Sequence, residues 1–359
     1  MTTKEKSDKD LIQVLDPDGR IVDKSALKGI DESDMLEMYR LMNFTRLWNS
    51  KALSLQRQGR LGTLASVRGQ EASNVGMGLA LGPEDWFCPS FREYGAMFAR
   101  GIRPKELYRY WGGDERGAKP LEGSRVMPVC ITVGSHLLHA AGIAWGAKIR
   151  GERLAVMSSS GDGSTSQGDF HEALNFAGVF KLPVVFAIQN NHWAISVPVE
   201  KQTASETLAE KACAYGIDNA RVDGNDIFAV YLTAKRLLKA ARSDFRPALM
   251  ELVTYRMDDH TTSDDASRYR TEEMLAPWKA KDPIARLQKY LAADRGWDDQ
   301  KDKDLMEELA AEVERYVKEY EGAPHPPPEQ IFEHTYAEMP WHLREEREEL
   351  LRQVGEAEK

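Results

Sequence analysis

The sequence predicts an α/β fold in which a parallel sheet carries helices on both faces. Two observations support this fold class. Residues 154–188 read as strand, helix and strand, and a unit of this kind joins two parallel strands through a right-handed crossover. A helical pattern over residues 227–242 and a buried-strand pattern over 249–255 then repeat the alternation, as further units of the same sheet should.

The central unit is recognised by the spacing of its apolar residues. Leu154–Met157 is a short apolar run, and the sequence Gly161-Asp162-Gly163 ends it. Helical spacing follows, with apolar residues at Phe170, Leu174, Phe176, Ala177 and Phe180. Val184–Ile188 is β-branched and aromatic, as the residues of a buried strand usually are.

The flanking segments predict further elements. Residues 12–15 and 20–23 lie on either side of the turn sequence DPDG and predict a small hairpin. A helical pattern runs from Asp31 toward Arg57, with Asp31 or Ser33 as its N-cap. Another helix is expected near residues 205–214.

The C-terminal part is predicted to be helical from Thr271 onward. An apolar stripe at helical spacing indicates either core or a docking surface. Its members are Leu305, Leu309, Val313, Tyr316, Val317 and Tyr320. We therefore divide the chain into three parts: an N-terminal tail and hairpin (1–29), an α/β domain (30–322), and a proline-rich linker with a C-terminal docking segment (323–359).

Composition limits the classes of function. The chain has 359 residues, of which 42% are hydrophobic and 29% are charged, as is ordinary for a globular protein. The net charge of −9 argues against a nucleic-acid partner, which would favour a basic surface. The charged start MTTKEKSDKD lacks a signal sequence, and no apolar run is long enough to span a membrane. The three cysteines are far apart, so we expect reduced thiols and a cytoplasmic protein.

Polar residues follow both strands of the central unit. Asp162 comes just after the first strand, and Asn190 and Asn191 come just after the second. Because neighbouring parallel strands end at the same edge of a sheet, Asp162 and Asn191 should share one crevice. Carboxylate and amide oxygens suit Mg²⁺, which commonly recruits phosphate oxygens as further ligands. The backbone N–H groups of Gly163 and Ser164, near a helix N-terminus, could hold an anion.

Each motif alone has an ordinary explanation, since Gly-Asp-Gly and Asn-Asn are both common in turns. Together, separated by one helix and one strand, they resemble the fingerprint of thiamine diphosphate enzymes. The resemblance implies that Asp162, Asn191 and the main-chain carbonyl of Trp193 bind Mg²⁺. It also implies a thiamine diphosphate-binding fold, in which Gly161, Gly163 and Ser164 belong to the cofactor site.

Three further motifs sharpen the resemblance. They are GQEA (69–72), FREYG (91–95) and YRMDDHTTSDDASRYR (255–270). From about Ile30 onward, the chain resembles the alpha subunit of the decarboxylating component of 2-oxo acid dehydrogenase complexes.

The family resemblance assigns roles to individual residues. It implies that Arg92 binds the cofactor's diphosphate and that His260 belongs to the active-site loop, where it assists transfer of the acyl group to lipoyl. It also implies that the main chain of Thr132, Val133 and Gly134 faces the aminopyrimidine ring. His136 is expected near the substrate mouth. His139 lies three residues after His136, on the same face of the predicted helix. We do not expect the two histidines to bind a metal, because the sequence offers no evident third ligand.

The chain departs from the family pattern at three positions. Phe91 stands where a tyrosine commonly precedes the diphosphate-binding arginine, and Thr63 stands where relatives often carry a substrate-facing phenylalanine. Thr261 occupies the position that is a phosphorylated serine in mammalian members, so regulation there is not assumed, and Ser263 is a weaker candidate.

The resemblance also implies partners and a reaction. The chain has room for one large α/β domain, whereas activation of the cofactor needs a glutamate from a second domain. We therefore expect a separate beta subunit in an α₂β₂ heterotetramer, which acts with a lipoyl-bearing dihydrolipoyl acyltransferase. Branched-chain 2-oxo acids such as 2-oxoisovalerate are the preferred substrates, and pyruvate is the alternative. A non-catalytic Mg²⁺-nucleotide or scaffold protein is the alternative from another class.

Overall fold

The computed structural model describes residues 10–119, 122–333 and 335–357. The charged tail predicted over residues 1–9 lies outside this range. The chain forms two compact units, one that ends at Val317 and one that begins at Lys318. In the part of the chain that the structure describes, no helix has the length and apolar character needed to cross a membrane.

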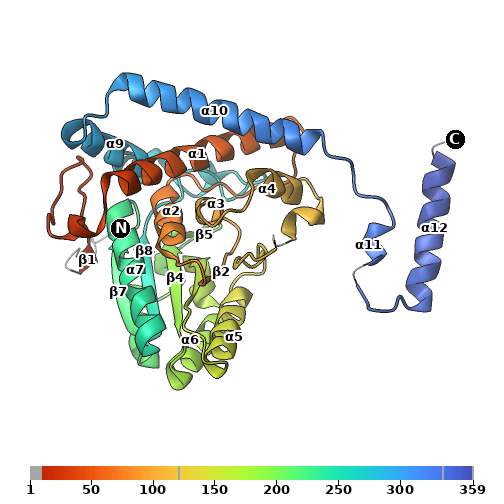
Figure 1. Cartoon of the computed structure of the whole chain (residues 1–359), viewed down its shortest axis with the longest axis horizontal. Helices are drawn as coiled ribbons and strands as arrows, with labels where there is room; N and C mark the ends of the chain where they lie inside the picture. Colours follow the sequence, from red (N-terminus) through yellow and green to blue (C-terminus); the bar gives the residue numbers. More distant parts are fainter. Residues whose placement is uncertain (1–9, 120–121, 334, 358–359) are drawn as a thin grey trace. The chain divides into compact units, whose positions relative to one another are not determined.

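One six-stranded sheet organises the first unit. The strands lie in the order β1-β7-β8-β4-β3-β2, and every neighbouring pair is parallel. Their bounds are β1 Leu11–Ile12, β2 Trp86–Cys88, β3 Val156–Gly161, β4 Val184–Asn190, β7 Asp218–Asp223 and β8 Ala248–Val253. Helices cover both faces of this sheet (Figure 1), so the predicted α/β fold is confirmed.

The central unit of the prediction is β3, helix α6 (Gly168–Phe180) and β4. Strands β3 and β4 pair in parallel, with Gly161 opposite Gln189. The chain therefore reaches Asp162 and Asn191 at the same edge of the sheet. Of the predicted apolar positions of α6, Phe170, Leu174 and Ala177 are buried, whereas Phe180 is exposed.

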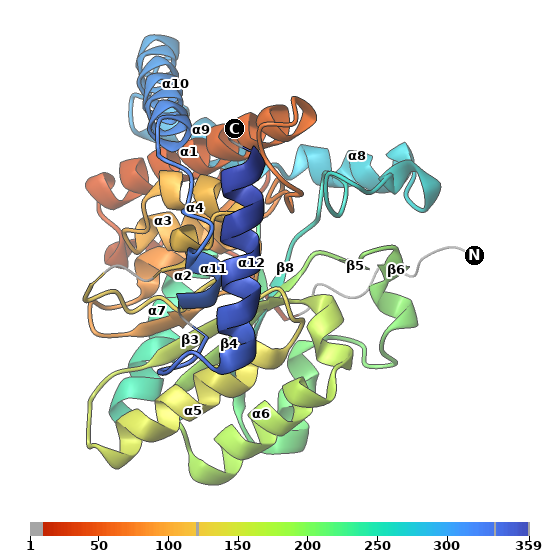
Figure 2. The same ribbon diagram turned by 90° about the vertical axis from the view of Figure 1, so that its right-hand side faces the viewer.

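Helices α5 (Ser135–Ile149) and α6 cover one face of the sheet, and α7 (Ile227–Asp244) covers the other. Figure 2 shows α5 and α6 side by side. The buried faces of α5 and α6 pack with β3 and β4 into one apolar core. On the opposite side, helix α2 (Glu71–Ala80) lies against α7.

Helix α1 (Glu32–Arg57) begins as predicted. The side chain of Asp31 accepts a hydrogen bond from the backbone N–H of Asp34, and the side chain of Asp34 bonds back to the N–H of Asp31. This reciprocal pair satisfies N–H groups that the helix itself leaves without partners. The predicted hairpin is present as an antiparallel bridge between Leu15 and Ile21. The parallel pairing of β1 with the edge strand β7 was not predicted.

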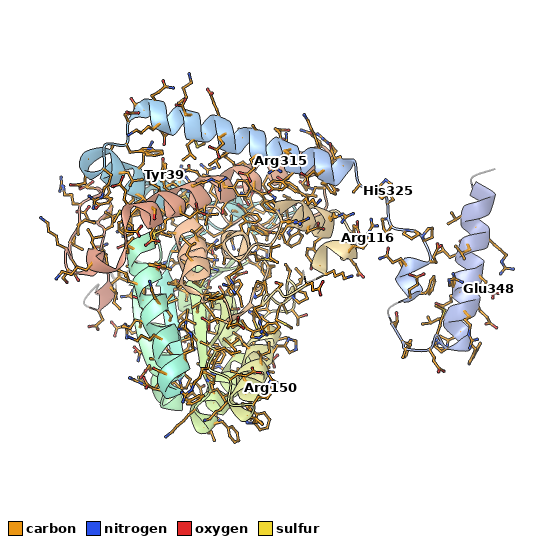
Figure 3. The ribbon with its side chains drawn as sticks, in the orientation of Figure 1. Tyr39, Arg116, Arg150, Arg315, His325 and Glu348 are labelled. Atoms are coloured by element: carbon orange, nitrogen blue, oxygen red, sulfur yellow. The ribbon has the colours of Figure 1, made fainter. Side chains whose placement is uncertain are left out.

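Helix α10 (Asp299–Glu321) carries the predicted apolar stripe. Leu309, Val313 and Val317 are buried. Within the first unit α10 packs against α1, on which Figure 3 labels Tyr39. The hydroxyl of Tyr39 donates to Asp302 of α10 over 2.7 Å. The three buried residues of the stripe are therefore core, whereas Leu305, Tyr316 and Tyr320 are half-buried. The second unit contains α11 (Gln330–Glu333) and α12 (Trp341–Ala357).

The remaining elements are short. They are α3 Tyr94–Ala99, α4 Pro104–Trp111, α8 Glu272–Ala280, α9 Pro283–Asp294, and the hairpin of β5 Trp193–Ala194 with β6 Val197–Pro198. The helix expected near 205–214 is a 3₁₀ segment over Ala209–Tyr215. Its predicted first turn does not form; there the side chain of Glu210 accepts the backbone N–H groups of Glu206 and Thr207.

Candidate functional site

A cavity of about 700 Å³ opens at the ends of β3 and β4. It is lined by most of the residues predicted for the site, which are Arg92, Val133, Gly161, Asp162, Gly163, Ser164, Asn191, Trp193 and His260. The crevice at the carboxyl ends of parallel strands is the usual ligand position in an open α/β sheet. The structure therefore brings together residues that lie far apart in the sequence.

Asp162 presents a buried carboxylate to this cavity. One of its oxygens, Oδ2, accepts a hydrogen bond of 2.8 Å from Nε2 of Gln202. The other, Oδ1, is buried and finds no partner among the described residues. Burial raises the pKa of Asp162 to about 6, although the hydrogen bond from Gln202 opposes this shift. Since an orphaned buried acceptor is costly, Oδ1 is suited to bind a cation.

Asn191 and Trp193 supply neutral oxygens beside Asp162. The side-chain oxygen of Asn191 accepts the N–H of Trp193 at 3.2 Å, and its amide nitrogen donates to Gln70 at 3.1 Å. Between them His192 adopts a left-handed φ of 69°. Within the described residues no three His, Cys, Asp or Glu side chains form a metal cluster. The oxygen-only set of one carboxylate, one amide and one carbonyl fits Mg²⁺.

Arg92 and His260 form the cationic end of the cavity. The Nη2 group of Arg92 donates to Nδ1 of His260 at 2.9 Å and to the carbonyl of His260 at 2.7 Å. Arginine can only donate, so Nδ1 of His260 is unprotonated and Nε2 carries the proton. Burial, followed by the charges of Arg92 and Arg256, lowers the pKa of His260 to about 4. Near neutral pH, the anion-binding charge at this end therefore belongs to arginine.

Arg256 joins this end of the site and was not assigned a role from the sequence. It is buried, and it donates to the carbonyl of Ile195 at 2.7 Å and to the carbonyl of Trp193 at 3.3 Å. It also donates to the hydroxyl of Tyr269 at 2.7 Å. An arginine placed directly after a buried strand is the signal that could have identified it.

Gln70 was also missed. It is fully buried and lines the cavity. Its Oε1 accepts from Asn191, while its Nε2 has no partner among the described residues. An unused amide donor beside an unused carboxylate oxygen indicates a ligand that carries both positive and negative groups, as a metal-bound diphosphate does.

The structure does not bring His136 to the cavity. Its ring is buried on the inner face of α5, and Nε2 lies 2.8 Å from the carbonyl oxygen of Ser159. Burial lowers its pKa to about 4. The expected place at the substrate mouth is therefore wrong, because the helix turns His136 toward the sheet. Thr132 is exposed and Gly134 is the N-cap of α5, and neither lines the cavity. Contact of their main chain with the cofactor stays a prediction.

Part of the cavity lining is apolar. This apolar side consists of Phe91, Tyr110, Trp111, Ile131 and Val133. The ring of Phe91 meets that of His260 edge-on, with centroids 6.3 Å apart. Thr63 also lines the cavity, and its hydroxyl lies 3.4 Å from the hydroxyl of Ser263. A small apolar group of a substrate would fit here.

A second cavity, of about 820 Å³, lies beyond Trp193 at the ends of β7 and β8. Its lining includes Glu251, Tyr255 and Trp278 but neither Asp162 nor Arg92. The larger cavity therefore lacks the predicted cofactor-binding side chains Asp162 and Arg92, and the smaller cavity is the candidate site.

Comparison with known proteins agrees with this geometry. The model of the family described as "Dehydrogenase E1 component" matches residues 39–329. A "Pyruvate dehydrogenase E1 component subunit alpha" of Acholeplasma laidlawii is 44% identical over 336 residues, which are 93% of this chain and 97% of that protein. Proteins of the same name from Staphylococcus epidermidis and Staphylococcus aureus are 36% identical over 340 residues, which are 94% of this chain and 92% of each relative.

Proposed function

We propose that this chain, which belongs to the dehydrogenase E1 component family, is the alpha subunit of a pyruvate dehydrogenase. The family assignment makes it a subunit of a decarboxylating 2-oxo acid dehydrogenase that depends on thiamine diphosphate. The choice of pyruvate is supported by the names of relatives that match more than nine-tenths of the chain. These names favour pyruvate, which the sequence predicted as the alternative substrate, over the branched-chain 2-oxo acids that were predicted first.

One observation carries the site assignment: an orphaned carboxylate oxygen and a buried arginine share one cavity. We infer that Asp162, Asn191 and the carbonyl of Trp193 hold Mg²⁺, and that Arg92 holds the diphosphate. When bound, thiamine diphosphate supplies the carbanion chemistry that releases CO₂ from a 2-oxo acid. The protein supplies binding and orientation. His260 stays neutral beside Arg92, which leaves a proton on Nε2 for donation to an oxygen acceptor.

The assignment also supports a partner subunit, because the site opens toward an uncovered apolar surface. Ile131 and Val133 line the cavity and are exposed. The surface continues along α5 through Leu138, Trp145 and Ile149, all of which are also exposed. An exposed apolar strip of this kind marks an interaction site.

The same surface contains a place where a helix could approach closely. Gly142 faces open space, since no described atom lies within 4 Å of a Cβ built there. Trp145 stands beside it and meets Phe176 edge-on at 5.3 Å. Because this strip lies on the helix that directly follows the cavity residues Ile131 and Val133, we infer that it docks the beta subunit that completes the cofactor site. A lipoyl-bearing acyltransferase would then accept the acyl group.

The test is to produce the chain together with a beta subunit and to supply Mg²⁺ and thiamine diphosphate. Decarboxylation of pyruvate and of 2-oxoisovalerate is compared by reduction of an artificial electron acceptor. We expect kcat/KM to favour pyruvate by about tenfold or more. A preference for 2-oxoisovalerate would return the substrate to the branched-chain class.

Two controls define the result. The purified chain alone is expected to be inactive, and appreciable turnover by it would contradict the need for a beta subunit. A formed complex that turns over neither acid would contradict the proposed function and favour a scaffold.

A further inference from the structure

Glu93 is a buried carboxylate in the candidate cavity to which the proposed function gives no role. It is 2% exposed and lines the same cavity as Arg92 and Asp162. Burial raises its pKa to about 6, and hydrogen bonds to its carboxylate oppose that shift. Unlike Asp162, it has no orphaned oxygen among the described atoms.

Three donors from separate parts of the chain converge on Glu93. Its Oε2 accepts the backbone N–H of Arg92 at 2.9 Å. Its Oε1 accepts the hydroxyl of Ser159 at 3.0 Å and the amide Nε2 of Gln189 at 2.9 Å. Gln189 in turn donates to the Ser159 hydroxyl at 3.1 Å and accepts from Asn74 at 2.9 Å. The network is fully buried.

Each donor belongs to a segment that carries a proposed ligand of the cofactor. Arg92 itself is the proposed diphosphate ligand, and it precedes Glu93 directly. Ser159 lies on β3 shortly before Asp162, and Gln189 lies on β4 two residues before Asn191. The carboxylate therefore ties together the loop and the two strand ends whose relative positions set the shape of the site.

A neutral amide could not replace this carboxylate. A backbone N–H and an amide NH₂ can only donate, so both oxygens of residue 93 must accept. In a glutamine one end would be an NH₂ group that faces another donor, whichever way the amide turned. A buried unmet donor is costly, and the loop or a strand end would have to move away.

We propose that Glu93 is a positioning residue that holds Arg92 and the ends of β3 and β4 in the arrangement required to bind the Mg²⁺–diphosphate group. This inference rests on the proposed function of the cavity. It assigns Glu93 no contact with the reacting atoms.

The test exchanges the carboxylate of Glu93 and the amide of Gln189 between the two positions. Glu93→Gln leaves donors facing each other, and Gln189→Glu brings two carboxylates together. In the double variant E93Q/Q189E, the new amide at position 93 would accept from the backbone of Arg92 and donate to the new carboxylate at position 189. That carboxylate would also accept from Asn74 and from the hydroxyl of Ser159. All donors would again have acceptors.

Each variant is assembled with the beta subunit, and calorimetry measures the affinity of the assembled complex for thiamine diphosphate in the presence of Mg²⁺. We expect each single variant to bind about 10- to 100-fold more weakly and the double variant to recover to within about fivefold of the wild type. At saturating cofactor, kcat should change less than the KM for cofactor. Asp85→Asn is the matched control, because Asp85 is a buried carboxylate bonded to Arg242 outside the cavity; it should lower thermal stability and leave cofactor affinity unchanged.

The outcomes separate the inference from the proposed function. Wild-type complex that does not bind the cofactor would overturn both. Wild-type binding with unchanged affinity in the single variants, or a double variant as weak as the singles, would overturn the role of Glu93 alone. Ser159→Ala removes one donor without creating a clash, so it applies where a single variant does not fold. Weaker cofactor binding in S159A supports the proposal, and unchanged binding overturns it.

Discussion

The polar end of the cavity and the apolar strip along α5 are built in opposite ways. At the polar end, Arg92 and His260 are buried or partly buried and bonded to each other. Along α5, Leu138, Trp145 and Ile149 are exposed, and Gly142 has open space before it. The chain therefore satisfies the polar groups of the proposed diphosphate end within itself, whereas the α5 strip leaves apolar side chains exposed, as a surface that packs against another chain does.

This difference predicts two kinds of failure. Substitutions at the polar end should weaken cofactor binding without changing assembly. Substitutions on the α5 strip should weaken assembly without destabilising the isolated chain.

The largest effect is expected from Asp162→Asn. Mutation of a residue that only hydrogen-bonds to a metal ligand typically lowers metal affinity by about 10- to 100-fold. Loss of a direct ligand should therefore weaken Mg²⁺-dependent cofactor binding by roughly 100-fold or more. The cofactor-free variant should nevertheless melt at a higher temperature than the wild type, because it no longer buries an unmatched carboxylate. Calorimetry and thermal denaturation measure the two effects.

The exposed Asp294→Asn on α9 is the control for Asp162→Asn. It should change neither quantity. Retention of Mg²⁺-dependent binding by D162N would contradict the assignment of Asp162 as a ligand.

The next effect concerns the α5 strip. Gly142→Leu should fill the space against which a partner helix would pack, and overpacking of this kind costs about 1–3 kcal/mol, or roughly 10- to 100-fold in affinity for the beta subunit. The isolated chain should melt at the wild-type temperature or slightly above it, because the new side chain points into open space and leucine favours a helix interior over glycine by about 0.5–1 kcal/mol. Size-exclusion chromatography at a series of concentrations measures the assembly.

Lys239→Leu, exposed on α7 at the opposite face of the sheet, is the matched control. A photocrosslinking residue at position 142 should attach to the beta subunit. Attachment to a second copy of this chain would assign the strip to a contact between alpha subunits instead.

The difference between the two regions also decides what could be predicted from sequence. Asp162 and Asn191 were predicted to share a crevice because the ends of two strands follow from the apolar pattern, and the structure places both at one cavity. Arg92 was assigned by resemblance, and it lines the same cavity. Glu93, Gln189 and Asn74 could not be found, since their buried hydrogen bonds join segments that only the folded chain brings together.

The error at His136 has a physical reason that the sequence does contain. Leu137, Ala140 and Ala144 face the sheet, whereas Leu138 and Trp145 face outward. His136 falls on the buried side of that division. The sequence pattern alone leaves the orientation of α5 ambiguous, because both of its faces are apolar. A helix that is apolar on two sides indicates a second packing surface.

The stability of the cofactor-free chain should depend on pH through Asp162 but not through the exposed residues of the α5 strip. The pKa of Asp162 is raised from 3.8 to about 6 in the folded chain. Well below pH 3.8 the carboxyl group of Asp162 is protonated in both the folded and the unfolded state, so its burial costs no stability. As the pH rises to 6, the unfolded state ionises first, so the folded state loses stability, by an amount on the order of 1–3 kcal/mol.

Denaturant unfolding of cofactor-free wild type and D162N between pH 4 and 7 measures this effect. The difference between the two proteins isolates Asp162 from Glu93, which titrates in the same range. The advantage of D162N should grow with pH and level off above 6, whereas Gly142→Leu should show the wild-type profile. A constant difference across the range would mean that Asp162 is ionised throughout.

The smallest effect is expected at Thr63, where the cavity's apolar side meets the loop of Ser263. Thr63→Phe adds bulk to the cavity that Phe91 also lines and should exclude a branched acyl group more than a methyl group. One or two methylenes in such a pocket are worth about 10-fold, so kcat/KM for 2-oxoisovalerate should fall by roughly 3- to 10-fold relative to pyruvate. Cofactor affinity should not change, because Thr63 touches neither Asp162 nor Arg92, and the exposed Thr271→Phe should leave the substrate ratio unaltered. An equal loss of kcat/KM for both acids would mean that Thr63 affects the position of the loop that carries His260 and does not select the substrate. The apolar side of the cavity would then resemble the polar end, because contacts within this chain would set the geometry of both.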